Sequence, residues 1–97
     1  MFSKYRYEHT KLSIEPRMVE EARNCLAEES KEIIKNGERF TKYFLKNSTA
    51  DGVLVKTVKE IAFDLSIPSY MLVKILEVLE REKVIYRRRG MIGLWKN

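Results

Sequence analysis

The chain has 97 residues, of which 44% are hydrophobic and 34% are charged, and its formal net charge is +5. This length suits one domain, and the composition is typical of a folded protein and not of a disordered one. Because the sequence contains no apolar run near the roughly 18 residues of a membrane span and no secretion-signal pattern at its start, we expect a cytoplasmic protein without a membrane partner.

Residues 1–14 alternate bulky and charged side chains, with Tyr5 and Tyr7 on one side and Lys4 and Arg6 on the other. This period of two predicts a short strand or an extended basic and aromatic arm. The break after it comes at Pro16, because proline suits the first turn of a helix.

Residues 15–36 are predicted to form one amphipathic helix. Apolar side chains recur at spacings of three, four and seven, with an interruption at Glu29 and Ser30. The pair Asn36-Gly37 predicts the helix end, since both residues tolerate left-handed backbone angles. The apolar stripe and its flank include Val19, Ala22, Cys25, Leu26 and Ile33.

Residues 37–97 are predicted to form a compact unit that starts with a helix and the short strand 53–55. Thr57 and Glu60 have the spacing of a capping box, which predicts the start of a second helix. The stretch 66–69 ends that helix, and Ser69 is expected to cap the next one.

Two strand-like stretches, residues 84–86 and 92–95, close the predicted unit as a hairpin. They are joined through residues 87–91, with Gly90 at the turn. Charge is unevenly distributed, because residues 15–35 carry six acids and four bases whereas residues 83–97 carry five bases and no acid. This asymmetry is expected when one surface faces a polyanion, and the fold must decide which one.

The order helix, strand, helix, tight turn, helix and hairpin resembles the winged-helix family of DNA-binding domains over roughly residues 38–97. Ala62 lies where a small residue lets the two helices of a helix-turn-helix cross, and Ser66 lies where the family often has glycine. Lys83 departs from the family, in which glycine commonly terminates the helix there. The buried positions of the motif are filled by Ile67, Leu72 and Ile75.

The resemblance implies an α+β, mostly α fold: a winged helix-turn-helix with an additional N-terminal amphipathic helix and a C-terminal β-hairpin wing. It also implies that the second helix of the motif enters the major groove of double-stranded DNA. We expect contacts to phosphates, base edges and thymine methyl groups there. The residues predicted to make them are Ser69, Tyr70, Met71, Val73 and Lys74.

The wing carries three consecutive cations, Arg87, Arg88 and Arg89, directly before the glycine of its turn. A solvated run that only aids solubility is the plain interpretation. Beside a helix-turn-helix, we expect contact with phosphates or with a narrow minor groove, which attracts arginine.

A symmetric homodimer is predicted through the apolar stripe of residues 15–36, because small DNA-binding modules usually pair to read palindromic sites. The alternative is that the stripe packs on its own domain. Cys25 is either a small hydrophobe on that helix or a disulfide between two copies. Residues 1–14 either follow DNA as an arm or pair with the partner subunit.

Two classes of function remain. The first is a transcriptional regulator in the manner of small archaeal or archaeal-virus proteins. The second is a winged-helix protein-interaction module in a transcription or replication assembly, with Met71, Val73 and Val78 as contact residues. An enzyme is not expected, because one histidine, one cysteine and no glycine-rich phosphate loop offer little chemistry. We predict no cofactor, no metal site and no small-molecule substrate.

Overall fold

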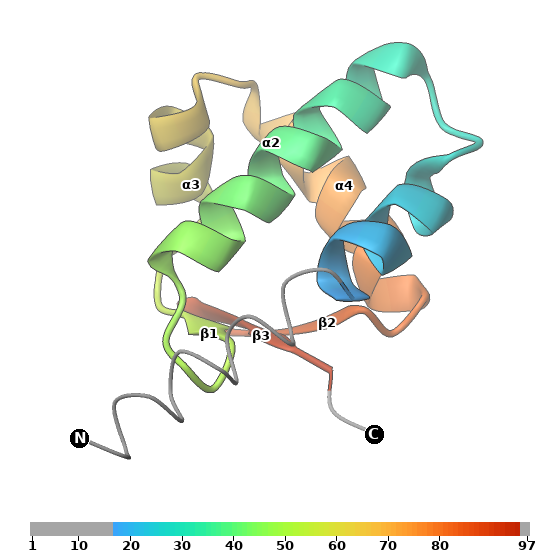
Figure 1. Cartoon of the computed structure of the whole chain (residues 1–97). Coiled ribbons are helices and arrows are strands. Elements are labelled where there is room, and N and C mark those ends of the chain that lie inside the picture. Colours follow the sequence, from blue (N-terminus) through green and yellow to red (C-terminus); the bar gives the residue numbers. More distant parts are fainter. Residues whose placement is uncertain (1–16, 96–97) are drawn as a thin grey trace.

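The computed structural model describes residues 17–95, so the predicted arm of residues 1–14 lies outside the described residues. The described chain is α+β and mostly helical, with a three-stranded antiparallel sheet, which agrees with the predicted class. Within residues 17–95, no helix combines the length and apolar character needed to cross a membrane. The elements in chain order are a helix over 17–26, α2 (Lys31–Asn47), β1 (Val53–Leu54), α3 (Val58–Leu65), α4 (Ser69–Arg81), β2 (Ile85–Arg88) and β3 (Met91–Leu94) (Figure 1).

The single helix predicted for residues 15–36 is wrong, because the chain turns at 27–30 and begins α2 there. Ser30 starts this helix by accepting a hydrogen bond at its Oγ from the Ile33 N–H (3.3 Å). This satisfies one of the free donors at a helix start. From there α2 crosses the front of the molecule without a break (Figure 1).

Gly37, the predicted helix end, lies inside α2 and is buried. A Cβ atom at this position would overlap Leu26 Cδ1 of the preceding helix. The glycine therefore allows two helices to pack closely, and this tertiary contact outweighs its tendency to end a helix.

The boundaries of α3 confirm the capping-box prediction. The Glu60 N–H donates to Thr57 Oγ1 (3.2 Å) and the Thr57 N–H donates to Glu60 Oε1 (2.9 Å). The bond from the Thr57 backbone lowers the pKa of Glu60. The predicted cap of α4 is wrong, because Pro68 takes the capping position without a side-chain bond and Ser69 is already helical.

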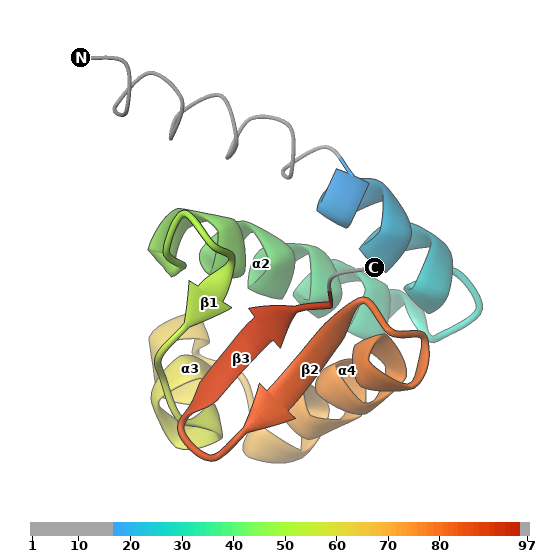
Figure 2. The ribbon, with the colours of Figure 1, turned by 90° about the horizontal axis from the view of Figure 1, so that it is seen from below.

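The sheet has the strand order β1-β3-β2. Its register pairs Leu54 with Ile92 and Arg88 with Met91. The first hairpin strand is therefore one residue longer than predicted, the second has the predicted length but begins one residue earlier, and the turn between them is short. Gly90 has φ 71° in this turn, a left-handed conformation that glycine adopts without steric cost. The sheet lies below the helices in Figure 1, and Figure 2 shows its other face turned outward, toward the viewer.

α4 is followed by a residue in the left-handed conformation, which glycine adopts most readily. Lys83 has φ 60°, its N–H donates to the Glu80 carbonyl (3.0 Å), and the Val84 N–H donates to the Leu79 carbonyl (2.9 Å). These two bonds form a Schellman motif, in which a non-glycine residue carries steric strain.

Lys83→Gly is therefore expected to raise the free energy of unfolding by about 0.5–1 kcal/mol. The Lys83 ammonium lies 5.7 Å from the centre of the Trp95 ring, and loss of this exposed contact offsets part of the gain. Urea unfolding measures the change. Lys83→Ala is the control, because it removes the same contact and keeps the strain; a glycine variant no more stable than the alanine variant contradicts the prediction.

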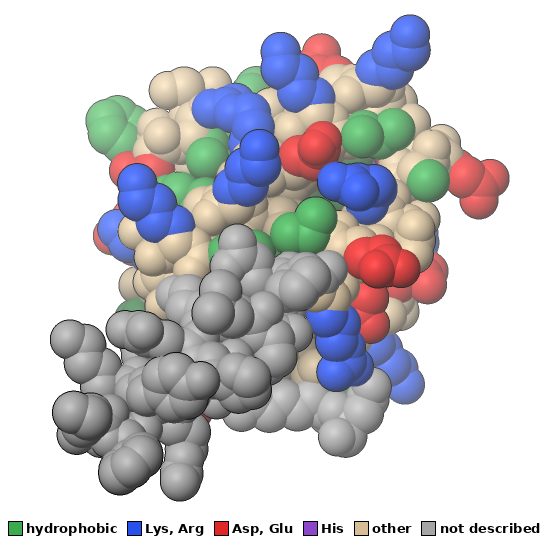
Figure 3. All heavy atoms as spheres, viewed as in Figure 1, with side chains coloured by type: hydrophobic (Ala, Val, Ile, Leu, Met, Phe, Trp, Pro, Cys, Tyr) green, Lys and Arg blue, Asp and Glu red, His purple; other side chains and the backbone are tan. Residues whose placement is uncertain are grey.

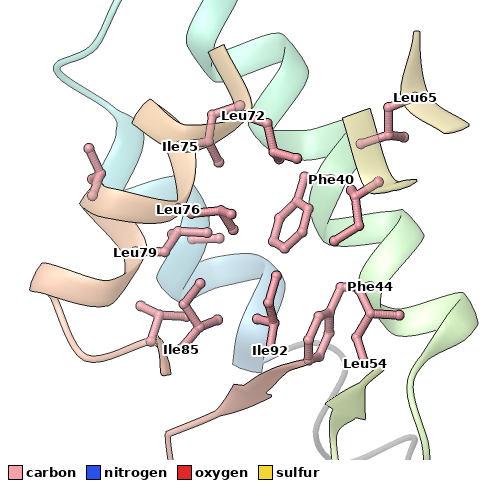
Figure 4. Close-up of a cluster of buried hydrophobic side chains, with 14 of the residues drawn as sticks. Phe40, Phe44, Leu54, Leu65, Leu72, Ile75, Leu76, Leu79, Ile85 and Ile92 are labelled. Carbon is pink, nitrogen blue, oxygen red and sulfur yellow. The ribbon is translucent and has the colours of Figure 1, made fainter. Parts of the chain in front are cut away.

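The core lies between the helices and the inner face of the sheet (Figure 4). Two rings of α2, Phe40 and Phe44, are fully buried at its centre, with their centroids 6.1 Å apart. Burial of such aromatic and aliphatic side chains contributes about 1.5–3 kcal/mol each. The other labelled members are Leu54, Leu65, Leu72, Ile75, Leu76, Leu79, Ile85 and Ile92.

Candidate nucleic-acid interface

The connection between α3 and α4 is a tight turn closed by the backbone. Ser66 adopts the left-handed conformation (φ 56°, ψ 45°), and its N–H donates to the Phe63 carbonyl at 3.1 Å. The next N–H, that of Ile67, donates to the Ala62 carbonyl at 3.1 Å. Ala62 is buried at 4% exposure, and α3 packs against α4.

Two polar contacts from α2 hold α3 in position. The Arg39 guanidinium donates to the Leu65 carbonyl, at the end of α3, and to Asn36 Oδ1 (3.1 Å). The Tyr43 hydroxyl donates to Asp64 Oδ2 (2.6 Å). Burial and this bond raise the pKa of Tyr43 to about 12, so the hydroxyl stays a donor at neutral pH. The orientation of the turn before α4 is thus fixed from α2.

The first turns of α4 present polar groups to solvent. Ser69 and Lys74 are exposed, Tyr70 is 73% exposed, and Val73 is half-buried. Lys74 is the one cation among these predicted positions, and Glu77 is exposed one turn further on. This surface can donate hydrogen bonds, but it carries little net positive charge.

Met71 is wrong as a predicted contact residue, because it is only 6% exposed. It lies four residues before Ile75 on the helix face that packs into the core. Val78, an expected contact residue of a protein-interaction module, is fully buried for the same reason.

The hairpin arginines differ from one another in their surroundings. Arg89 is exposed in the turn, whereas the Arg88 guanidinium lies 5.4 Å from the centre of the Tyr86 ring on the outer face of the sheet. Arg87 Nε and Nη2 both lie 3.0 Å from Glu80 Oε1 of α4. Residues 83–97 carry no acid of their own, but alternation along β2 turns Arg87 toward α4 and so brings it to Glu80.

The first turn of α4 and the β2–β3 turn both reach the lower margin of the molecule in Figure 2. Exposed cations are carried by both segments, Lys74 by α4 and Arg88 and Arg89 by the hairpin, and a duplex laid along this side would touch a helix and a hairpin together. We call this side the α4–hairpin face. The positive charge of this face comes from these three cations, because Arg87 is already paired with Glu80.

An exposed aromatic residue on α3 was missed by the sequence analysis. Phe63 is 84% exposed beside an open groove lined by Ile67, Pro68 and Ser69. The signal was present in the sequence, because Phe63 lies off the helical stripe formed by the apolar residues of α3. An isolated exposed ring is ordinary, but this one lines the same groove as exposed Ser69, the first residue of α4.

The predicted dimer residues are divided by the structure. Ala22 and Leu26 are 3% and 2% exposed inside the protomer's own core, so they have no surface to offer a second copy. Val19, Cys25 and Ile33 are half-buried and pack at the edge of that core. Burial raises the pKa of the Cys25 thiol, which makes it a poorer nucleophile at neutral pH. A dimer through these three residues stays a prediction.

No family model matches the chain, and neither a curated protein nor a solved structure is significantly similar to it. The interpretation of the α4–hairpin face accordingly depends on its own geometry.

Proposed function

We propose that this protein is a winged-helix domain that binds double-stranded DNA through the α4–hairpin face and acts as a transcriptional regulator. The proposal is supported by the strand order β1-β3-β2, the tight turn between α3 and α4 and the short hairpin after them. The observation that carries it is that the start of α4 and the hairpin turn lie at one margin of the molecule (Figure 2) and that both segments carry exposed cations, Lys74 on α4 and Arg88 and Arg89 on the hairpin.

In the proposed complex, the start of α4 lies in the major groove. Ser69 and Tyr70 donate to phosphates, and Lys74 pairs with a phosphate or a guanine edge. Arg88 and Arg89 follow the backbone or enter the minor groove. With one cation and no amide side chain on this part of α4, sequence preference is expected to be moderate.

Binding to a labelled duplex, measured by anisotropy over a range of salt concentrations, tests the proposal. Each phosphate contact releases condensed counterions, so log K should fall linearly with log salt by about 0.9 per contact. Selection from random DNA at physiological salt then reports the preferred site, and recovery of a palindrome would support a homodimer. Absence of measurable binding at low salt contradicts the proposal.

Lys74→Gln is expected to reduce preference for the selected site severalfold, because a base-edge pair contributes about 1–3 kcal/mol of discrimination. Tyr70→Phe removes one hydrogen-bond donor and keeps the ring, so it should weaken binding to the selected and the scrambled duplex equally. Both variants are compared by competition between the two duplexes. If Lys74→Gln reduces the affinity for both duplexes equally, Lys74 does not contact a base edge.

A protein-interaction module is the second candidate, and exposed Phe63 favours it. Aromatic side chains dominate the binding energy of many protein interfaces. In that case, Phe63→Ser would abolish binding to a protein partner and leave DNA binding unchanged. Binding to that partner would also depend weakly on salt, in contrast to the DNA complex.

A further inference from the structure

Five cations lie on the outward side of α2: Lys31, Lys35, Arg39, Lys42 and Lys46. Their spacings of four, four, three and four residues confine them to an arc of about 80° on a helix with 100° per residue. All five are exposed, and they extend along about 22 Å of the helix at 1.5 Å per residue. We call them the α2 stripe; Figure 3 shows blue side chains following the diagonal course of α2.

The α2 stripe leaves α2 with an excess of positive charge, because its five cations outnumber the two acids of the helix, Glu32 and Glu38. Among the residues that the structure describes, the ion pairs within 4.0 Å involve other cations, and none joins a member of the stripe to a carboxylate. Glu32 and Glu38 flank the stripe without interrupting it. Arg39 donates to an amide oxygen and a carbonyl, which are neutral acceptors, so it keeps its net charge.

The α2 stripe and the α4–hairpin face point in different directions. α2 and α4 pack against each other through their apolar sides, so their exposed sides are turned apart. In Figure 2, α2 lies along the upper side of the molecule, whereas the first turn of α4 and the hairpin turn lie along the lower margin. A straight duplex on one face would leave the other face open.

We propose that the α2 stripe binds the phosphate backbone of a second DNA duplex, so that one protomer bridges two DNA segments. This inference rests on the proposed function, because the first duplex occupies the α4–hairpin face. Lysine ammonium groups on flexible stems act as point charges, and the stripe has no amide side chain that reads bases. Binding to it is therefore expected to be independent of sequence.

The chemistry of the stripe favours a nucleic acid over two other anionic partners. A helix that lies on a membrane inserts an apolar side, but the apolar side of α2 is in the core. A second copy could offer the helix over 17–26, but its two acids are balanced by Arg17 and Arg23, and Glu21 is already paired with Arg17 (3.6 Å). A duplex offers one negative charge per 1.7 Å or so, which matches a continuous line of cations.

The test is a bridging experiment with full-length protein. A biotinylated duplex on beads binds the protein, and capture of a second, fluorescent duplex of scrambled sequence is measured. The variant Lys35→Gln/Lys42→Gln removes two stripe charges. The matched control, Arg17→Gln/Lys83→Gln, removes two exposed charges away from the stripe and the α4–hairpin face. Thermal unfolding confirms that both variants fold.

We expect the stripe variant to stay bound to the bead duplex but to capture the second duplex at least tenfold less than the control. The salt slope of capture should fall by about 2, for two lost contacts. If the stripe variant captures as much second duplex as the control, the inference is overturned. It is also overturned if the stripe substitutions leave capture unchanged but alter the oligomeric mass of the protein or its binding to anionic vesicles.

The variant Arg88→Ala/Arg89→Ala separates this inference from the proposed function. Suppose that this variant no longer binds the bead duplex, while the stripe variant captures the second duplex as well as the control does. That result overturns the second-duplex site and leaves the proposed function standing. Bead binding that depends on the stripe and not on Arg88 and Arg89 overturns the proposed function, and the second-duplex site with it.

Discussion

Gly37→Val is expected to lower the free energy of unfolding by about 2 kcal/mol, the usual cost of overpacking a well-filled core. Valine places three carbons where even a Cβ would overlap Leu26 Cδ1. A cavity of about 50 Å³ beside this contact lets Leu26 yield to a single added carbon, so alanine is a weak test and valine a decisive one. For a chain of this size, the midpoint of thermal unfolding should fall by roughly 10 °C.

The control for this prediction is a double-mutant cycle with Leu26→Ala. That substitution alone costs about 2–4 kcal/mol, because it leaves a cavity in the core. In the Gly37→Val background it makes room for the new side chain, so the double variant should be more stable than the sum of the single effects predicts. Strict additivity would mean that the two positions do not touch, and Gly37 would then need another explanation.

Arg88→Ala/Arg89→Ala is expected to weaken DNA binding about 30-fold at physiological salt, since hydrogen bonds to charged groups contribute about 1 kcal/mol or more each. If, in the proposed complex, both arginines follow the phosphate backbone, the loss should be similar for every duplex sequence, and the salt slope should fall by about 2. Anisotropy titrations at several salt concentrations measure both quantities.

Arg87→Ala is the matched control, because it removes the same charge from the same strand. Its guanidinium is held by Glu80, so its removal should change DNA affinity less than either neighbour does. It should instead cost a few tenths of a kcal/mol of stability, as a partly exposed ion pair does. Equal losses for Arg87, Arg88 and Arg89 would show that the ion pair opens in the complex.

The fold after residue 57 could be predicted because local signals there agree with the tertiary structure. The capping box at Thr57 and Glu60, the small Ala62 at the helix crossing and Gly90 in the hairpin each specify a conformation within a few residues. Lys83 shows that the conformation can persist where the expected glycine is missing, at a cost in strain.

The structure of the first half of the chain was harder to predict. Its decisive contacts join residues that are distant in the sequence, and some of these residues fit more than one local structure. Gly37 predicted a helix end, and only the approach of Leu26 gives it another role. That error divided α2 at residue 37 and so hid the α2 stripe, which becomes visible as a period only along an unbroken helix. Likewise, the pairing of Arg87 with Glu80 depends on how β2 lies against α4.

Gly93 has a consequence for anyone who redesigns the hairpin. Because Gly93 has no side chain, the Tyr86 ring can pack directly against its backbone, and the Arg88 guanidinium lies over that ring. A methyl group at position 93 would lift the ring and with it the support of the arginine. A graft of this hairpin onto another scaffold must therefore include β3, which holds Gly93, as well as β2, which holds the arginines.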